Sequence, residues 1–249
     1  MPLHPWWPDG LPTWLHPHVL FEVLAYAVAF RLFLWLRRRG HDSVGNVEHR
    51  GAIVAAAAIG AAAGARLLFL FEDPVLTWQN VWNPVLWSSS GRTIVGALLG
   101  GWLAVEVAKK ALGVTRSTGD VVVAPVLVGM GLGRLGCFFS GLQDGTHGVP
   151  TGTILGMDLG DGVPRHPVML YEIAFLAILG GGLWAARASE AYEGARFRRF
   201  MGAYLAFRLV VETWKTQPFV YAGLSSIQVA SLLGLVWVGV DAWGRRVRA

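Results

Sequence analysis

Long apolar stretches restrict the fold of this chain more than any other feature. Seven segments are each close to the length needed to cross the core of a bilayer, and they carry few charges. Only 15% of all residues are charged and 54% are hydrophobic, whereas about a quarter of the residues in a soluble domain are charged. We therefore predict an all-α integral membrane protein. The predicted membrane helices are 19–36, 51–71, 92–112, 120–140, 167–186, 200–217 and 226–243.

Basic residues predict how these helices are oriented. Lys and Arg accumulate in the cytoplasmic loops of membrane proteins, and fourteen of the 21 in this chain follow the first, third, fifth or seventh predicted helix. Arg92 and Arg165 fall on the opposite side. The N-terminus is therefore expected outside, in the periplasm, and the C-terminus in the cytoplasm. Because topology accounts for the net charge of +5, we expect no nucleic-acid partner.

The chain has no clear linker and no low-complexity block. We therefore expect one membrane domain over residues 1–249, with the long outer loop at about 141–166 acting either as a cap over a site or as a solvated connector. The single cysteine, Cys137, excludes an intrachain disulfide. Its expected role is that of a small buried residue, and a nucleophilic role is the less favoured interpretation.

Charged and polar side chains gather in the middle and outer parts of the predicted bilayer. A helix rise of about 1.5 Å per residue places Arg66 and Arg134 about 20 Å above the cytoplasmic edge of a core about 30 Å thick. Arg208 lies near the middle, and Glu212 follows it by one turn. The other groups at this level are Lys215, Glu22, His166, Tyr171 and Glu172.

Two interpretations of these buried charges are open. Buried charges commonly pair inside a membrane protein, so Arg208 could pair with Glu212, and Arg66 or Arg134 could pair with Glu172, only to hold helices together. The excess of arginine favours an anion instead, because a guanidinium group binds phosphate through two parallel hydrogen bonds. A phospholipid headgroup in the outer leaflet would supply that phosphate.

The buried charges and the glycine-rich segments each have an alternative interpretation. Buried Arg and Glu also line the permeation paths of transporters, but the polar groups do not continue into the cytoplasmic half, apart from Glu106. The glycines in GALLGG (96–101) and GMGLG (129–133) either let a ligand approach the backbone or let helices pack closely, and packing is the favoured interpretation.

Several segments of the chain resemble the bacterial prolipoprotein diacylglyceryl transferase family. They are GARL (64–67), GRLGCFF (133–139), PTGTILGMDLGDGVPRHPVMLYE (150–172) and FRLVVETWK (207–215). The resemblance implies an enzyme of the bacterial inner membrane with seven membrane helices, and we expect it to be a monomer. Such an enzyme moves the diacylglyceryl group of phosphatidylglycerol to the thiol of a lipobox cysteine in a prolipoprotein signal peptide, releasing glycerol phosphate. It implies no metal and no organic cofactor.

The resemblance also assigns candidate catalytic residues. The two essential arginines of the family fall on Arg134 and Arg208, and its His-Pro-x-x-Leu-Tyr-Glu element includes His166 and Glu172. We expect the arginines to stabilise charge on the leaving phosphate. The thiol, whose ordinary pKa is about 8.5, needs a base, and His166 is the first candidate, with Glu172 or His147 as alternatives. The expected substrate-binding residues are Arg66, Tyr171, Glu212, Glu22, Gly133 and Gly136.

The chain departs from the family pattern at four positions. The His-Gly-Gly element that opens the family's third helix reads GRTIVGALLGG here, with Val95 at the position of the histidine. Cys137 and Ser140 replace asparagines, and Leu142 replaces a glutamate. Two alternatives are therefore open: a related transferase with a different acceptor, and a non-catalytic lipid-binding membrane protein.

Overall fold

The computed structural model describes residues 7, 16–41, 47–83, 91–189, 192–216 and 218–246. The chain divides into two compact units, and each is described by itself. The first comprises Met1–Asp42, Thr118–Phe200 and Thr213–Thr216, and the second comprises Ser43–Ser117, Met201–Glu212 and Gln217–Ala249. That the chain acts as one membrane domain stays a prediction.

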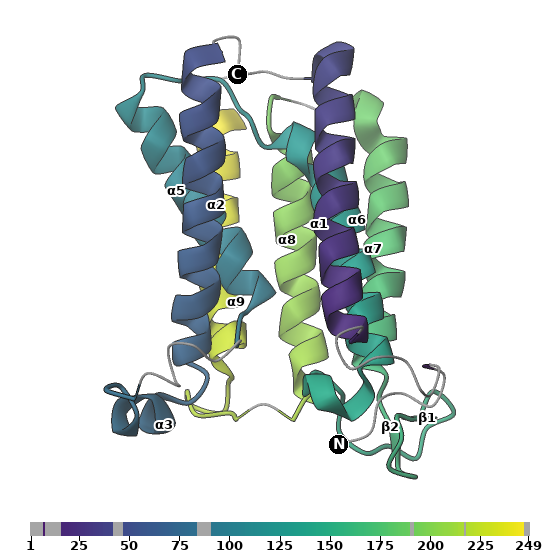
Figure 1. The fold of residues 1–249 in the computed structure, drawn as a ribbon. Helices are drawn as coiled ribbons and strands as arrows, with labels where there is room; N and C mark the ends of the chain where they lie inside the picture. The colour runs from purple at the N-terminus through teal and green to yellow at the C-terminus, as the bar shows by residue number, and fades with distance from the viewer. Residues whose placement is uncertain are drawn as a thin grey trace. The chain divides into compact units, whose positions relative to one another are not determined.

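Three long helices form the frame of the first unit, and the middle one packs against both others (Figure 1). They are α1 (Pro17–Leu36), α6 (Asp120–Phe139) and α7 (Val168–Ala185), with α6 in the middle. A Cβ atom on Gly136 would lie 2.8 Å from the Cβ of Phe21, which is closer than two such atoms pack. The glycine therefore allows α6 to approach α1 at this point. Two short helices, η1 (Arg37–His41) and η3 (Ala186–Ser189), directly follow α1 and α7.

The loop between α6 and α7 is a folded segment of the first unit. It contains the short helix η2 (Gly141–Asp144) and an antiparallel pair of two-residue strands, β1 (Met157–Asp158) and β2 (Pro164–Arg165). The side chain of Asp158 accepts hydrogen bonds from the backbone N–H groups of residues 160, 161 and 162. These bonds fold residues 158–162 into a turn. The role of the loop as a cap stays a prediction.

The second unit is built around a close crossing of two helices, α2 (Val47–Leu70) and α5 (Ile94–Ala111). A Cβ atom on Gly64 would lie 2.3 Å from the carbonyl oxygen of Gly96. Gly60 and Gly100 make an equally tight contact one turn away, so only glycine permits this approach of the backbones. The glycines of GALLGG thus pack helices.

The rest of the second unit includes most of α8 (Ala195–Val211), whose first residues, up to Phe200, belong to the first unit. Helix α9 (Ser226–Arg246) packs against α5, where the rings of Trp102 and Trp237 stack with their centroids 3.8 Å apart. The remaining short helices are α3 (Pro74–Gln79) and η4 (Glu212–Trp214).

Each of the seven predicted segments lies on a helix, so the helical architecture is confirmed. The sixth differs most, because α8 begins at Ala195 and ends at Val211; the predicted end at residue 217 lies outside the described residues. Five helices among the described residues are long and apolar enough to span a membrane. Helix α5 carries three charges near its end and α8 carries several arginines, so seven spans and their orientation stay predictions. The five candidate spans are Pro17–Arg39, His49–Leu70, Asp120–Phe139, Val168–Ala185 and Ser226–Gly244.

Candidate functional site

A buried ion pair joins two helices of the first unit. Arg134 lies in the last turns of α6 and Glu172 in the first turns of α7, and Nε of the arginine lies 2.9 Å from Oε2 of the glutamate. Arg134 is 6% exposed and Glu172 is fully buried. The arginine also donates a hydrogen bond from Nη1 to the sulfur of Cys137 at 3.7 Å. Glu172 is therefore a partner of Arg134, as one interpretation of the sequence proposed.

A second buried ion pair lies in the second unit. Nη2 of Arg208 donates a hydrogen bond to Oε2 of Glu212 at 2.6 Å. Arg208 is 2% exposed, and Glu212 is fully buried. The two residues are four positions apart, so the end of α8 places them together without help from another helix. This is the pairing that the sequence allowed for Arg208.

His166 is held by side-chain and backbone contacts within the first unit. Its Nδ1 lies 3.1 Å from the hydroxyl oxygen of Tyr171, and its ring stacks on that of Trp214, with the centroids 5.6 Å apart. Its backbone N–H donates to the carbonyl of Val149, and its own carbonyl accepts from Gly148. These contacts fix the ring of His166, and they are compatible with two roles. His166 could accept a proton, or it could be a purely structural residue.

The other predicted substrate contacts are distributed over both units. Arg66, in the second unit, donates to the carbonyl of Gly91 at 3.1 Å. Glu22, in the first unit, accepts a hydrogen bond from Tyr26 at 3.3 Å. Gly133 has open space where a Cβ would stand. The first unit thus contains Arg134, Glu172, His166, Tyr171, Glu22, Gly133 and Gly136, and the second contains Arg208, Glu212 and Arg66.

A polar cluster next to Arg134 does not appear in the sequence-based site. His18 stands at the start of α1, and its Nδ1 lies 2.8 Å from Oδ1 of Asp144, at the end of η2. Burial raises the pKa of Asp144, but hydrogen bonds from His18 and Thr146 outweigh this effect and lower the pKa to about 2. Asp144 is therefore ionised at neutral pH. No sequence pattern links a histidine and an aspartate so far apart, so only the fold reveals this pair.

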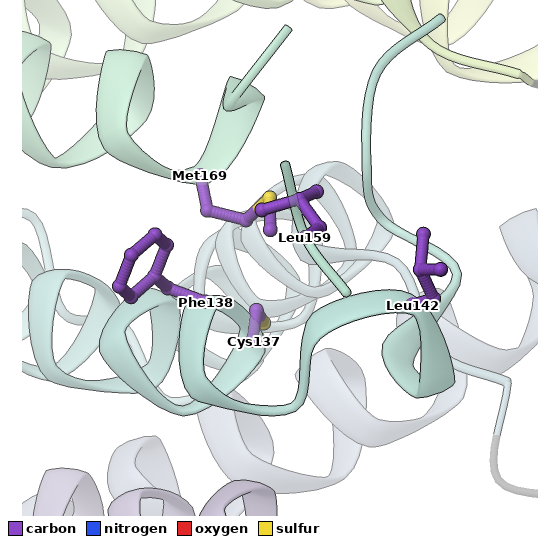
Figure 2. Close-up of a cluster of buried hydrophobic side chains, with 5 residues drawn as sticks. All are labelled: Cys137, Phe138, Leu142, Leu159 and Met169. Carbon is purple, nitrogen blue, oxygen red and sulfur yellow. The ribbon is translucent and has the colours of Figure 1, made fainter. Parts of the chain in front are cut away.

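An apolar cluster lies against the same part of α6. Figure 2 shows that its side chains come from α6, η2, the outer loop and α7. Cys137 and Leu142, two of the departures from the family pattern, belong to this cluster. The apolar neighbours of Leu142 suit an apolar side chain at this position, whereas the sulfur of Cys137 also accepts a hydrogen bond from Arg134. The burial of Cys137 is also confirmed. The members of the cluster are Cys137, Phe138, Leu142, Leu159 and Met169.

Comparison with known proteins identifies the family. The sequence profile of "Prolipoprotein diacylglyceryl transferase" matches residues 15–243. A phosphatidylglycerol–prolipoprotein diacylglyceryl transferase of Geobacter sulfurreducens is 31% identical over 220 residues, covering 82% of this chain and 79% of the relative. The protein of the same name from Bordetella avium is 27% identical over 218 residues, covering 86% of this chain and 81% of the relative. The chain therefore belongs to the prolipoprotein diacylglyceryl transferase family.

Proposed function

We propose that this protein transfers the diacylglyceryl group of phosphatidylglycerol to the lipobox cysteine thiol of a prolipoprotein. The observation that carries this proposal is the family match over residues 15–243, with relatives named for that reaction. The protein acts as a monomer with seven membrane spans, its N-terminus periplasmic and its C-terminus cytoplasmic, in the bacterial inner membrane. The lipid then enters from the outer leaflet, at the level of the buried arginines.

The reaction is a displacement at a glycerol carbon. The thiolate sulfur forms a bond to that carbon, the bond from carbon to the phosphate oxygen breaks, and its electron pair stays on the phosphate. Arg134 and Arg208 stabilise the charge that develops on this phosphate, in a site with little water. The contact of Glu172 with Nε of Arg134 supports a role for this glutamate in fixing the direction of the guanidinium group.

His166 takes the proton of the thiol in this proposal. Its Nδ1 contacts the hydroxyl oxygen of Tyr171. In the tautomer in which Nδ1–H donates to that oxygen, Nε2 is the nitrogen that would accept the proton, and Tyr171 sets the orientation of the ring. Glu172 and His147 are the alternative candidates for the base that accepts the thiol proton. Arg66, Glu22 and Glu212 bind or position the headgroup in the same proposal.

The test uses the purified full-length chain in detergent or liposomes, with labelled phosphatidylglycerol and a lipobox peptide. We expect a thioether product with the cysteine peptide, and none with a peptide in which serine replaces the cysteine. Release of glycerol phosphate without peptide modification would support a different acceptor instead. Lipid binding without any turnover, by protein with a normal helical circular dichroism spectrum, would contradict the transferase and support a lipid-binding protein.

A further inference from the structure

Three side chains with metal-binding atoms meet in the first unit, where the start of α1, the last turn of α6 and the end of η2 come together. One nitrogen of His18, the sulfur of Cys137 and one oxygen of Asp144 lie within 4.8 Å of one another. We propose that these residues bind a Zn²⁺ ion whose fourth coordination position takes the acceptor thiol. The binding of the ion stands by itself, and its role with the thiol rests on the proposed function.

The donor set selects the metal. Imidazole, thiolate and carboxylate are the three ligand types that zinc uses in proteins, whereas Mg²⁺ and Ca²⁺ prefer oxygen ligands alone. Zinc lies about 2.0–2.3 Å from such atoms, so two ligands of one tetrahedral ion lie about 3–4 Å apart. The three atoms here need side-chain shifts of about 1 Å to reach these distances. The spacing and the composition of this cluster are therefore close to those of a three-ligand zinc site.

The contact between His18 and Asp144 suits replacement by a metal ion. Nδ1 of His18 and Oδ1 of Asp144 lie 2.8 Å apart, and a bound cation would take the place of the proton in this hydrogen bond because it needs the same lone pairs. Thr146 donates a hydrogen bond from its hydroxyl to the other oxygen of Asp144. Outer hydrogen bonds of this kind orient metal ligands and raise their affinity.

Cys137 has apolar neighbours, and it also lies close to a histidine that is partly exposed. Cys137 belongs to the apolar cluster with Leu159 and Met169 (Figure 2), and an apolar shell strengthens the electrostatic interactions of an ion. The metal-binding atoms of His18 and Asp144 lie within 4.8 Å of its sulfur. The side chain of His18 is 42% exposed, whereas that of Asp144 is 8% exposed, so an ion would approach the cluster from the side of His18. A purely apolar role explains the burial of Cys137, but not the polar pair next to its sulfur.

A site with three protein ligands keeps a fourth position open, as catalytic zinc sites do. A thiol that coordinates there would give up its proton more readily, and His166, the base of the proposed function, would accept that proton. This sulfur then attacks the glycerol carbon of the lipid, the carbon–oxygen bond breaks, and its electron pair leaves with glycerol phosphate. Because Arg134 contacts the sulfur of Cys137 at 3.7 Å, the ion lies next to the arginine proposed to hold that phosphate. The resemblance implies no metal, whereas the side chains of His18, Cys137 and Asp144 are of the types that bind zinc.

The first experiment measures the metal itself. The full-length chain, without a histidine tag, is loaded with Zn²⁺ in detergent, desalted and analysed by mass spectrometry for zinc. We expect about one zinc ion per chain, and a loss of about tenfold or more in affinity for Cys137→Ala and for Asp144→Asn. His49→Ala is the matched control, because His49 lies in α2 of the second unit, and it should keep the ion. Wild-type protein that retains no zinc would overturn the site.

The second experiment uses Co²⁺ as the probe. Cobalt bound to a thiolate gives a charge-transfer absorption band, which we expect in the wild type and in His49→Ala and which Cys137→Ser should lose while keeping its circular dichroism spectrum. A lipobox cysteine peptide should shift the band, whereas the serine peptide should not. An absorption band that does not shift when the cysteine peptide is added would contradict the proposal that the acceptor thiol takes the fourth coordination position.

Activity separates this inference from the proposed function. Transfer by zinc-free protein at the wild-type rate would overturn the role of the ion and leave the transferase intact. A stoichiometric zinc site in a protein that modifies no cysteine peptide would overturn the transferase and leave the metal site intact.

Discussion

The two buried ion pairs have the same chemistry, but they arise from different levels of structure. Arg208 and Glu212 are one turn apart at the end of α8, so the helix alone brings them together. Arg134 and Glu172 stand on α6 and α7, so they meet only when those helices pack. Arg134 also adjoins the polar cluster of the first unit through Cys137. A pair formed by tertiary packing can report on the assembly of a site, whereas a local pair reports mainly on its own helix.

The largest expected effect on the rate of thioether formation comes from substitution of Arg134 or Arg208. We expect Arg134→Leu and Arg208→Leu each to lower the rate of thioether formation by about 100- to 1,000-fold, because each loses a donor to the developing phosphate charge. Initial rates with labelled phosphatidylglycerol and a lipobox peptide measure this effect. Arg187→Leu is the control, because Arg187 is exposed and stacks on Trp184. A folded Arg134→Leu protein with the wild-type rate would remove this residue from the mechanism.

The second prediction separates the pairs by stability. The unfolded state of a membrane protein keeps its helices, so Arg208 and Glu212 stay close after unfolding, while Arg134 and Glu172 separate. Double-mutant cycles with Leu at the arginines and Gln at the glutamates should give a coupling of about 3 kcal/mol for the first-unit pair. For the local pair they should give about 1 kcal/mol or less. Unfolding in detergent measures both, and equal couplings would contradict the distinction.

A third prediction compares helix packing in the two units. A Cβ on Gly64 would lie 2.3 Å from the backbone oxygen of Gly96, whereas a Cβ on Gly136 would lie 2.8 Å from the Cβ of Phe21, which is a less severe overlap. We expect Gly64→Ala to lower the free energy of unfolding by about 1–3 kcal/mol, and Gly136→Ala to lower it by less. Gly133→Ala is the matched control, since nothing lies within 4 Å of its added Cβ. A larger loss for Gly136→Ala would mean that the first unit tolerates less change than its contacts indicate.

The same contrast explains what the sequence could predict. Apolar segment length located the long helices but not the short ones, and the spacing of four residues was sufficient to propose the Arg208–Glu212 pair. The depth of Arg134 in its helix left Glu172 as one possible partner, but only packing selected it. The cluster of His18, Cys137 and Asp144 had no signal, because its members come from three distant segments. Leu142 illustrates the same limit, since its apolar neighbours belong to elements that meet only in the fold.

The smallest expected effect concerns Asp158, a carboxylate that backbone N–H groups hold in place. Asp158 is exposed and accepts backbone hydrogen bonds from Gly160 and Gly162, which lower its pKa. A lowered pKa stabilises the turn at every pH above the ordinary aspartate value of about 3.9, and this stability is lost as the pH falls through the lower value of the folded state. We therefore expect the amide protons of Gly160 and Gly162 to stay protected from exchange at pH 5 and to lose that protection at lower pH. The Asp158→Ala variant should lose the protection of these amide protons at both pH values. The buried pair of Arg134 and Glu172 should still hold α6 and α7 together in this variant. Protection in Asp158→Ala equal to that of the wild type would show that the strand pair, not the carboxylate, holds this turn.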